Sequence, residues 1–207
     1  MDGLKTVGSS KSAEITEKKS KFIANIFYVE NEKEAEEILK KIKKKYFDAK
    51  HNCYAYRILD GENIIQRSSD DGEPSGTAGK PMLTILEKNN FVNCIVIVTR
   101  YFGGILLGTG GLVKAYSDVT IQCLNNSEIM NIELGYEVNL QLNYQDLEKI
   151  KYFCKINNIK IQEENFSEKI ELILNIQKNK IQALSEFCSK NLNNSKCNIK
   201  KEKNIIY

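Results

Sequence analysis

Two polar, glycine-containing segments hold most of the residues in this sequence that could do chemistry. The first, residues 68–81, reads SSDDGEPSGTAGKP and combines carboxylates, hydroxyls and a lysine. Loops longer than about 12 residues without regular structure are uncommon unless they are functional or disordered. We therefore expect this loop to contact an anion through Ser75, Thr77 and Lys80. The alternative is an ordinary loop whose polar side chains satisfy its own backbone.

The second segment, residues 100–114, reads RYFGGILLGTGGLVK and is typical of a strand that runs into a glycine-rich loop and then a helix. Backbone N–H groups in such a loop, and at the start of the helix, attract an anion. Lys114 lies one turn into the predicted helix and can reach the same anion. Close packing of the helix on a sheet is an equally open explanation for the glycines. The five are Gly103, Gly104, Gly108, Gly110 and Gly111.

Arginine is rare in this chain and its positions are informative. Of the 30 basic residues only three are arginine, and all three flank the two segments: Arg57, Arg67 and Arg100. A planar guanidinium suits bidentate contact with phosphate, which favours an anion site. A buried salt bridge to Asp70, Asp71 or Glu73 explains the same placement equally well. The single histidine, His51, is a possible base or anion contact, although a hydrogen-bonded structural role is favoured.

Hydrophobic periodicity predicts the elements that position these segments. The helix over residues 32–47 begins with glutamates and ends with lysines, which complements the helix dipole, so a solvated helix end is favoured over a binding surface. In the first half we expect a strand at 21–29, that helix, a hairpin at 51–59 and 63–68, a short helix at 81–88, a strand at 92–101 and a helix around 112–123.

The second half predicts a β-α-β-β-α-β order, the ferredoxin-like arrangement. The first helix, residues 144–157, is entered through Asn143 as a cap, with Asp146 three residues later. We therefore expect two α+β domains, residues 1–130 with the glycine-rich loops and residues 131–207 with the ferredoxin-like fold. The remaining elements are strands at 134–142, 159–166, 168–176 and 197–206 and a helix around 181–192.

Composition narrows the classes of protein. The net charge of +3 is mild and neither half is strongly basic, which excludes coating of nucleic acid by bulk charge but leaves room for a local patch. Six cysteines without a Cys-x-x-Cys pair and one histidine predict neither a zinc site nor a disulfide framework. No apolar run approaches the ~20 residues of a membrane span, so we expect a cytoplasmic protein with no membrane partner.

Three blocks carry a resemblance to a known family: HNCYAY at 51–56, DDGEPSGTAGK at 70–80 and RYFGGILLGTGGLVKAYS at 100–117. They resemble the IMPACT/YigZ family in its bacterial two-domain form. The resemblance implies an N-terminal β-α sandwich similar to domain IV of elongation factor G, and a C-terminal domain similar to domain V. Lys80 and Lys114 depart from the arginine that the family usually has, which weakens any bidentate phosphate contact there.

The resemblance also carries a theme of function. Eukaryotic members regulate translation by restraining activation of a stress kinase that phosphorylates an initiation factor, so translation or RNA association is what passes to bacterial members. Our leading hypothesis is a non-enzymatic RNA- or ribosome-associated protein, without cofactor or metal, whose glycine-rich loops bind phosphate backbone. The expected contacts are His51, Arg67, Ser75, Thr77, Lys80, Arg100, Gly103, Gly104, Gly108, Gly110, Gly111 and Lys114.

Two alternatives stay open at this point. One is an enzyme that acts on a phosphorylated small molecule or nucleotide at the glycine-rich loop, with Asp70, Asp71 or Glu73 as metal ligand or base. The other is a protein–protein regulator of the translation machinery that uses the helix at 32–47 as its docking face.

Overall fold

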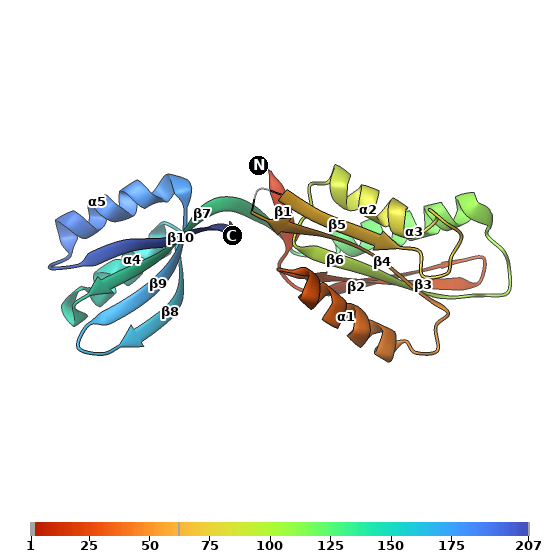
Figure 1. The fold of residues 1–207 in the computed structure, drawn as a ribbon, viewed down its shortest axis with the longest axis horizontal. Coiled ribbons are helices and arrows are strands. Elements are labelled where there is room, and N and C mark those ends of the chain that lie inside the picture. The colour runs from red at the N-terminus through yellow and green to blue at the C-terminus, as the bar shows by residue number, and fades with distance from the viewer. Residues whose placement is uncertain (1–2, 62, 207) are drawn as a thin grey trace. The chain divides into compact units, whose positions relative to one another are not determined.

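The computed structural model of the protein describes residues 3–61 and 63–206, and its contacts divide the chain into two compact units (Figure 1). The N-terminal unit is Leu4–Met130, and the C-terminal unit consists of the described residues from Asn131 onward together with Gly3. The division falls inside strand β7 (Ile129–Leu142). The described strands form two five-stranded sheets and each unit has its own buried core, so the protein is a two-domain α+β protein.

The N-terminal unit contains every predicted element of the first half, preceded by two strands that the periodicity did not predict. These two strands, β1 (Leu4–Val7) and β2 (Lys11–Glu17), are short, and β2 buries only Ala13. The predicted elements are β3 (Ser20–Tyr28), α1 (Glu32–Lys45), β4 (His51–Asp60), β5 (Asn63–Ser69), α2 (Gly79–Lys88), β6 (Cys94–Tyr101) and α3 (Gly108–Asn125).

The five-stranded sheet of this unit has the order β2-β3-β6-β4-β5 and is antiparallel throughout. Helices α2 and α3 cover one face and α1 packs on the other (Figure 1). Strand β6 is central, and its alternate residues fill both cores: Val96 and Val98 toward α2 and α3, Ile95 and Ile97 toward α1. Burial on both faces explains why β6 is an unbroken apolar run rather than an alternating one.

Helix α1 ends in the way its charges predict. Its first turn carries Glu32 and Glu34 and its last turn carries three lysines, so the charges at both ends interact favourably with the helix dipole. The backbone N–H of Glu34 donates to the side chain of Asn31, and the Glu34 carboxylate accepts from the backbone N–H of Glu30. Asn31 is therefore the N-cap, a role that helix periodicity alone did not indicate.

Four strands of the second sheet belong to the C-terminal unit and have the ferredoxin-like order β10-β7-β9-β8, with these neighbours antiparallel. Both helices contribute to its core, where the alternating Val138, Leu140 and Leu142 of β7 are fully buried. Its other elements are the 3₁₀ turns η1 (Tyr144–Asp146) and η2 (Lys178–Lys180), α4 (Leu147–Ile156), β8 (Lys160–Phe166), β9 (Ile170–Gln177), α5 (Ile181–Asn191) and β10 (Lys196–Ile206).

The predicted cap at the first helix of this unit was wrong. The Asn143 side chain donates to the carbonyl of Asn193 rather than capping the helix. Asp146 is fully buried, and its carboxylate accepts from Lys149 Nζ at 2.8 Å and from the Asn193 backbone N–H at 3.0 Å. Both side chains therefore bind Asn193 in the segment that follows α5. Asn193 is far from them in the sequence, so local spacing could not reveal this contact.

None of the helices in the described part of the chain combines the length and the apolar character needed to cross a membrane.

Candidate functional site

The loop between β5 and α2 is closed by its own first carboxylate. Asp70 accepts three backbone hydrogen bonds, from Gly76 at 2.8 Å, from Ala78 at 2.9 Å and from Gly79 at 2.8 Å. Gly79 is the first residue of α2, so Asp70 also satisfies free N–H groups at that helix start. Asp70 therefore satisfies the backbone of its own loop, which is the alternative that the sequence analysis gave to an anion site.

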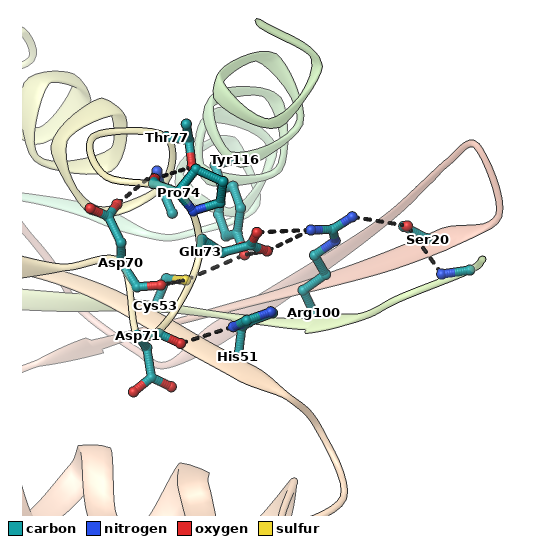
Figure 2. Close-up of polar contacts among 12 residues, drawn as sticks. Ser20, His51, Cys53, Asp70, Asp71, Glu73, Pro74, Thr77, Arg100 and Tyr116 are labelled. Carbon is teal, nitrogen blue, oxygen red and sulfur yellow. Dashed lines mark hydrogen bonds and ion pairs between the residues drawn. The ribbon is translucent and has the colours of Figure 1, made fainter. Parts of the chain in front are cut away.

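The next residue, Asp71, fastens the loop to β4 and α1. Its carboxylate accepts from the backbone N–H of Asn52 at 2.7 Å and forms an ion pair with Lys43 at 2.7 Å. Its carbonyl oxygen lies 2.9 Å from Nδ1 of His51, whose side chain is buried. His51 therefore has the structural role that the sequence favoured, and its ring holds the loop backbone in place (Figure 2).

A buried ion pair connects the two sequence segments. Nη1 of Arg100 donates to both carboxylate oxygens of Glu73, at 2.7 and 2.9 Å, and the two side chains are only 6% and 3% exposed. The Tyr116 hydroxyl donates to Glu73 at 2.9 Å and accepts from the Cys53 thiol at 3.3 Å, while Nη2 of Arg100 reaches Ser20 at 3.4 Å (Figure 2). The buried salt bridge considered for the arginines is thus confirmed for Arg100 with Glu73.

Two members of this network, Cys53 and Tyr116, have raised pKa values. Burial raises the pKa of the Cys53 thiol to about 12. The pKa of the Tyr116 hydroxyl is raised well above its ordinary value, first by burial and then by the neighbouring Cys53 and Glu73. Because the thiolate and phenolate are the nucleophilic forms, both side chains are hydrogen-bonding members of the core.

Backbone geometry accounts for three glycines of the segment between β6 and the start of α3. A Cβ on Gly103 would lie 2.0 Å from the backbone carbon of Lys19, and the Gly103 N–H donates to Ser20 Oγ at 3.2 Å. Gly104 and Gly108 both have positive φ, at +84° and +74°. Close packing therefore accounts for Gly103, which anchors the loop on the turn between β2 and β3.

The start of α3 leaves its amide groups exposed. The residue before it, Leu107, provides no side-chain cap, and the first turn has no acidic residue. Gly108 and Gly110 are exposed, and Lys114, one turn further on, is exposed as well. The N-terminal N–H groups and the positive end of the helix dipole thus face solvent, which is the arrangement that favours an anion.

Sequence reasoning missed the most exposed part of this region. Phe102, Ile105 and Leu106 are 50%, 43% and 82% exposed, although all three are apolar. Beside them, Lys18 and Lys19 form the turn between β2 and β3 with left-handed φ of +45° and +64°. We call residues 18–19 and 102–106 together the exposed tip. No signal in the sequence marks this turn, because such turns normally use asparagine and glycine.

The structure places the twelve predicted contact residues in different surroundings. His51, Thr77 and Arg100 use their polar atoms inside the protein, Thr77 by donating to the Pro74 carbonyl at 2.6 Å, so the expectation that they contact an external phosphate needs correction. Arg67 is exposed on β5 and pairs with Glu32 of α1 at 3.2 Å. The other exposed members are Ser75, Lys80, Gly104, Gly108, Gly110 and Lys114, while Gly103 and Gly111 are half-buried.

The carboxylates that an enzyme would need are also engaged. Asp70 and Asp71 accept backbone and lysine hydrogen bonds, and Glu73 binds Arg100 and Tyr116. Across residues 3–61 and 63–206, no group of three or more His, Cys, Asp or Glu side chains lies close enough to hold a metal ion.

Comparison with known proteins agrees with the two units. The family model of the Impact N-terminal domain matches residues 18–124, and that of a domain of unknown function, DUF1949, matches residues 140–192. IMPACT family member YvyE of Bacillus subtilis is 40% identical over 94% of this chain and 89% of its own length. An IMPACT family member of Haemophilus influenzae is 37% identical over 84% of this chain and 87% of its own.

A solved structure extends the likeness to the fold. The crystal structure of a hypothetical protein is 30% identical and aligns with a TM-score of 0.63, covering 93% of this chain and 96% of that one. The match to the Impact N-terminal domain includes both glycine-containing segments and the buried network that joins them. The chain therefore belongs to the IMPACT family.

Proposed function

We propose that this protein is a non-enzymatic binding module of the translation machinery, which docks on the ribosome through the exposed tip and the start of α3. The family resemblance supports the theme of translation, and the match over most of the chain to bacterial IMPACT family members supports applying it here. The observation that carries the docking is the exposed tip itself, where Leu106 is 82% exposed beside a lysine turn.

The chemistry of the tip fits a surface made of both RNA and protein. Exposed apolar side chains that gather on a surface mark interaction sites, and Phe102, Ile105 and Leu106 lie within a stretch of five residues. Lys18 and Lys19 add positive charge that can neutralise phosphates without reading sequence. The uncapped start of α3 supplies backbone N–H groups for the same purpose.

Contacts with the rest of the unit position Gly103 and Phe102 of the tip. Gly103 locks the loop onto the Lys19 backbone, and the guanidinium of Arg100 lies 5.5 Å from the ring centroid of Phe102. Arg100 in turn is held by Glu73 in the buried network. A binding surface gains affinity when its side chains are already positioned before contact, because less conformational entropy is lost on binding.

The geometry favours binding over catalysis. An enzyme at this loop would need Asp70, Asp71 or Glu73 as metal ligand or base, and each of these carboxylates already has at least two hydrogen-bond donors in the fold. Releasing any of them would leave buried donors without partners, at a cost of about 1–3 kcal/mol for each.

Sedimentation of the full-length protein with ribosomal particles tests the proposal. We expect the protein to co-migrate with ribosomal particles, and less so as the salt concentration rises. In a plot of log affinity against log salt concentration, the slope should become shallower by about 1 for each phosphate that a variant no longer neutralises. The Lys18→Glu/Lys19→Glu and Leu106→Ser variants should move to the top of the gradient. Lys40→Glu/Lys41→Glu, a matched charge reversal on exposed positions of α1, should sediment like wild type.

Two results would count against the proposal. One is wild-type protein that stays at the top of the gradient even at low salt. The other is co-migration that the two tip variants leave unchanged, which would assign ribosome docking to another surface.

A further inference from the structure

The core of the C-terminal unit contains three thiols from three elements. Cys154 lies on α4, Cys188 on α5 and Cys197 on β10, and all three pack in or against one apolar cluster. Cys154 and Cys188 are buried, whereas Cys197 is partly exposed, and none is in a disulfide. These residues lie outside the candidate site of the N-terminal unit.

The fold directs Cys188 and Cys197 toward each other. Cys197 is opposite Leu140 of β7, which is fully buried under the helices, and opposite residues of an antiparallel pair project from the same face of the sheet. Cys197 therefore points to the side on which α5 lies. On α5, Cys188 lies one turn after the buried Leu184 and belongs to the apolar cluster against which Cys197 packs, and each of the two thiols shifts the pKa of the other.

We propose that Cys188 and Cys197 are a site of oxidative modification, where a peroxide converts the two thiols into a reversible disulfide that joins α5 to β10. The two residues are nine positions apart, and the chain reverses direction between them in residues 192–195. Strand β10 pairs only with β7 among the described strands of this unit's sheet, so the disulfide would fasten an edge strand to the helix above it.

The chemistry balances with one peroxide for each pair. The Cys197 thiolate attacks a peroxide oxygen, which forms a sulfenic acid and, after proton uptake, releases the first water. The Cys188 sulfur then attacks Sγ of Cys197, and the displaced hydroxide leaves as the second water with the Cys188 proton. Two thiols and one hydrogen peroxide thus give one disulfide and two waters.

The environment separates the two roles. The Cys188 thiol lowers the pKa of Cys197, which is also the more exposed thiol, so Cys197 is the attacking group. The Cys197 thiol, and then burial, raise the pKa of Cys188, which suits a resolving thiol that keeps its proton until the second step. Burial raises the pKa of Cys154 to about 12, so we expect it to stay reduced.

Peptide mapping of the full-length protein tests the proposal without any substitution. Reduced protein is treated with hydrogen peroxide and then denatured, its free thiols are alkylated, and it is digested with trypsin. The three cysteines then fall on separate peptides, 152–155, 181–190 and 197–200. We expect peptides 181–190 and 197–200 to appear cross-linked, two hydrogens lighter than their sum, and to separate again with dithiothreitol, while peptide 152–155 stays alkylated.

The variants sharpen the result. Cys154→Ser should keep the cross-link, and Cys197→Ser should abolish it and leave Cys188 open to alkylation on denaturation. The proposal is overturned if Cys197 is oxidised to a sulfinic acid while Cys188 stays alkylatable. It is equally overturned if Cys188 couples to Cys154, or if a non-reducing gel shows dimers linked through Cys197.

Discussion

Replacing Glu73 by glutamine should destabilise the N-terminal unit more than the removal of an ordinary surface charge. The change keeps the shape of the side chain and leaves an acceptor for the Tyr116 hydroxyl, but it removes the charge that faces Arg100. Because Arg100 is 6% exposed at its side chain, water cannot solvate the guanidinium in its place.

The size of the effect follows from this burial. Breaking a buried pair by removing one partner typically costs about 3–5 kcal/mol, whereas exposed pairs contribute about 0–1 kcal/mol. For a unit of this length we expect the melting temperature to fall by roughly 10–20 °C. The matched control is Glu14→Gln, which breaks the exposed pair with Lys21, whose side chains are 45% and 50% exposed, and should cost less than about 1 kcal/mol.

Two readouts measure the change in the right unit. Urea unfolding gives the free energy of unfolding. It is followed by circular dichroism because the chain has no tryptophan whose fluorescence could be used. Amide exchange of peptides from β6 reports opening of the N-terminal unit separately. The double variant Glu73→Gln/Arg100→Met removes both charges and should cost at least about 2 kcal/mol less than the two single changes added together. The prediction is wrong if Glu73→Gln lowers the free energy of unfolding by less than about 1 kcal/mol. It is also wrong if the effect of the double variant equals the sum of the two single effects.

Two further predictions concern the glycines and the response to acid. The Gly103→Ala variant should destabilise the N-terminal unit by about 1–3 kcal/mol, because the added Cβ meets the Lys19 backbone. The Gly110→Ala variant should stabilise it by about 0.5–1 kcal/mol, because Gly110 lies in α3 with open space around it. Thermal melts of the two variants should therefore shift in opposite directions. The bonds from Lys149 and from the Asn193 backbone lower the pKa of Asp146 below its ordinary 3.8, so the unfolded chain takes up this proton first as the pH falls. The C-terminal unit therefore loses stability as the pH falls below about 4. The Asp146→Asn variant should be less stable than wild type at pH 5, yet its free energy of unfolding should fall less between pH 5 and pH 3, which denaturant unfolding at the two pH values would measure. An equal loss of stability in both proteins would contradict this role of Asp146.

Much of the fold could be predicted because hydrophobic periodicity is a local property. The apolar run of β6, the helical spacing in α1 and the alternation in β7 each depend on which face of an element is buried, and a few consecutive residues reveal that face. The β-α-β-β-α-β order of the second half followed in the same way. Strand β2 escaped prediction because it lies at a sheet edge and buries only Ala13.

The sequence alone also indicated part of the candidate site, because the glycine-containing segments and the three arginines are visible as a pattern of residue types, whereas the turn at Lys18 and Lys19 was not predicted. What each polar side chain does was decided only by the tertiary structure. Arg100 meets Glu73 across 27 residues, Asp146 meets Asn193 across 47, and Gly103 meets the Lys19 backbone. A charged side chain can bind an external partner or satisfy an internal one, and burial decides between them, because a charge removed from water must find its partner inside the fold.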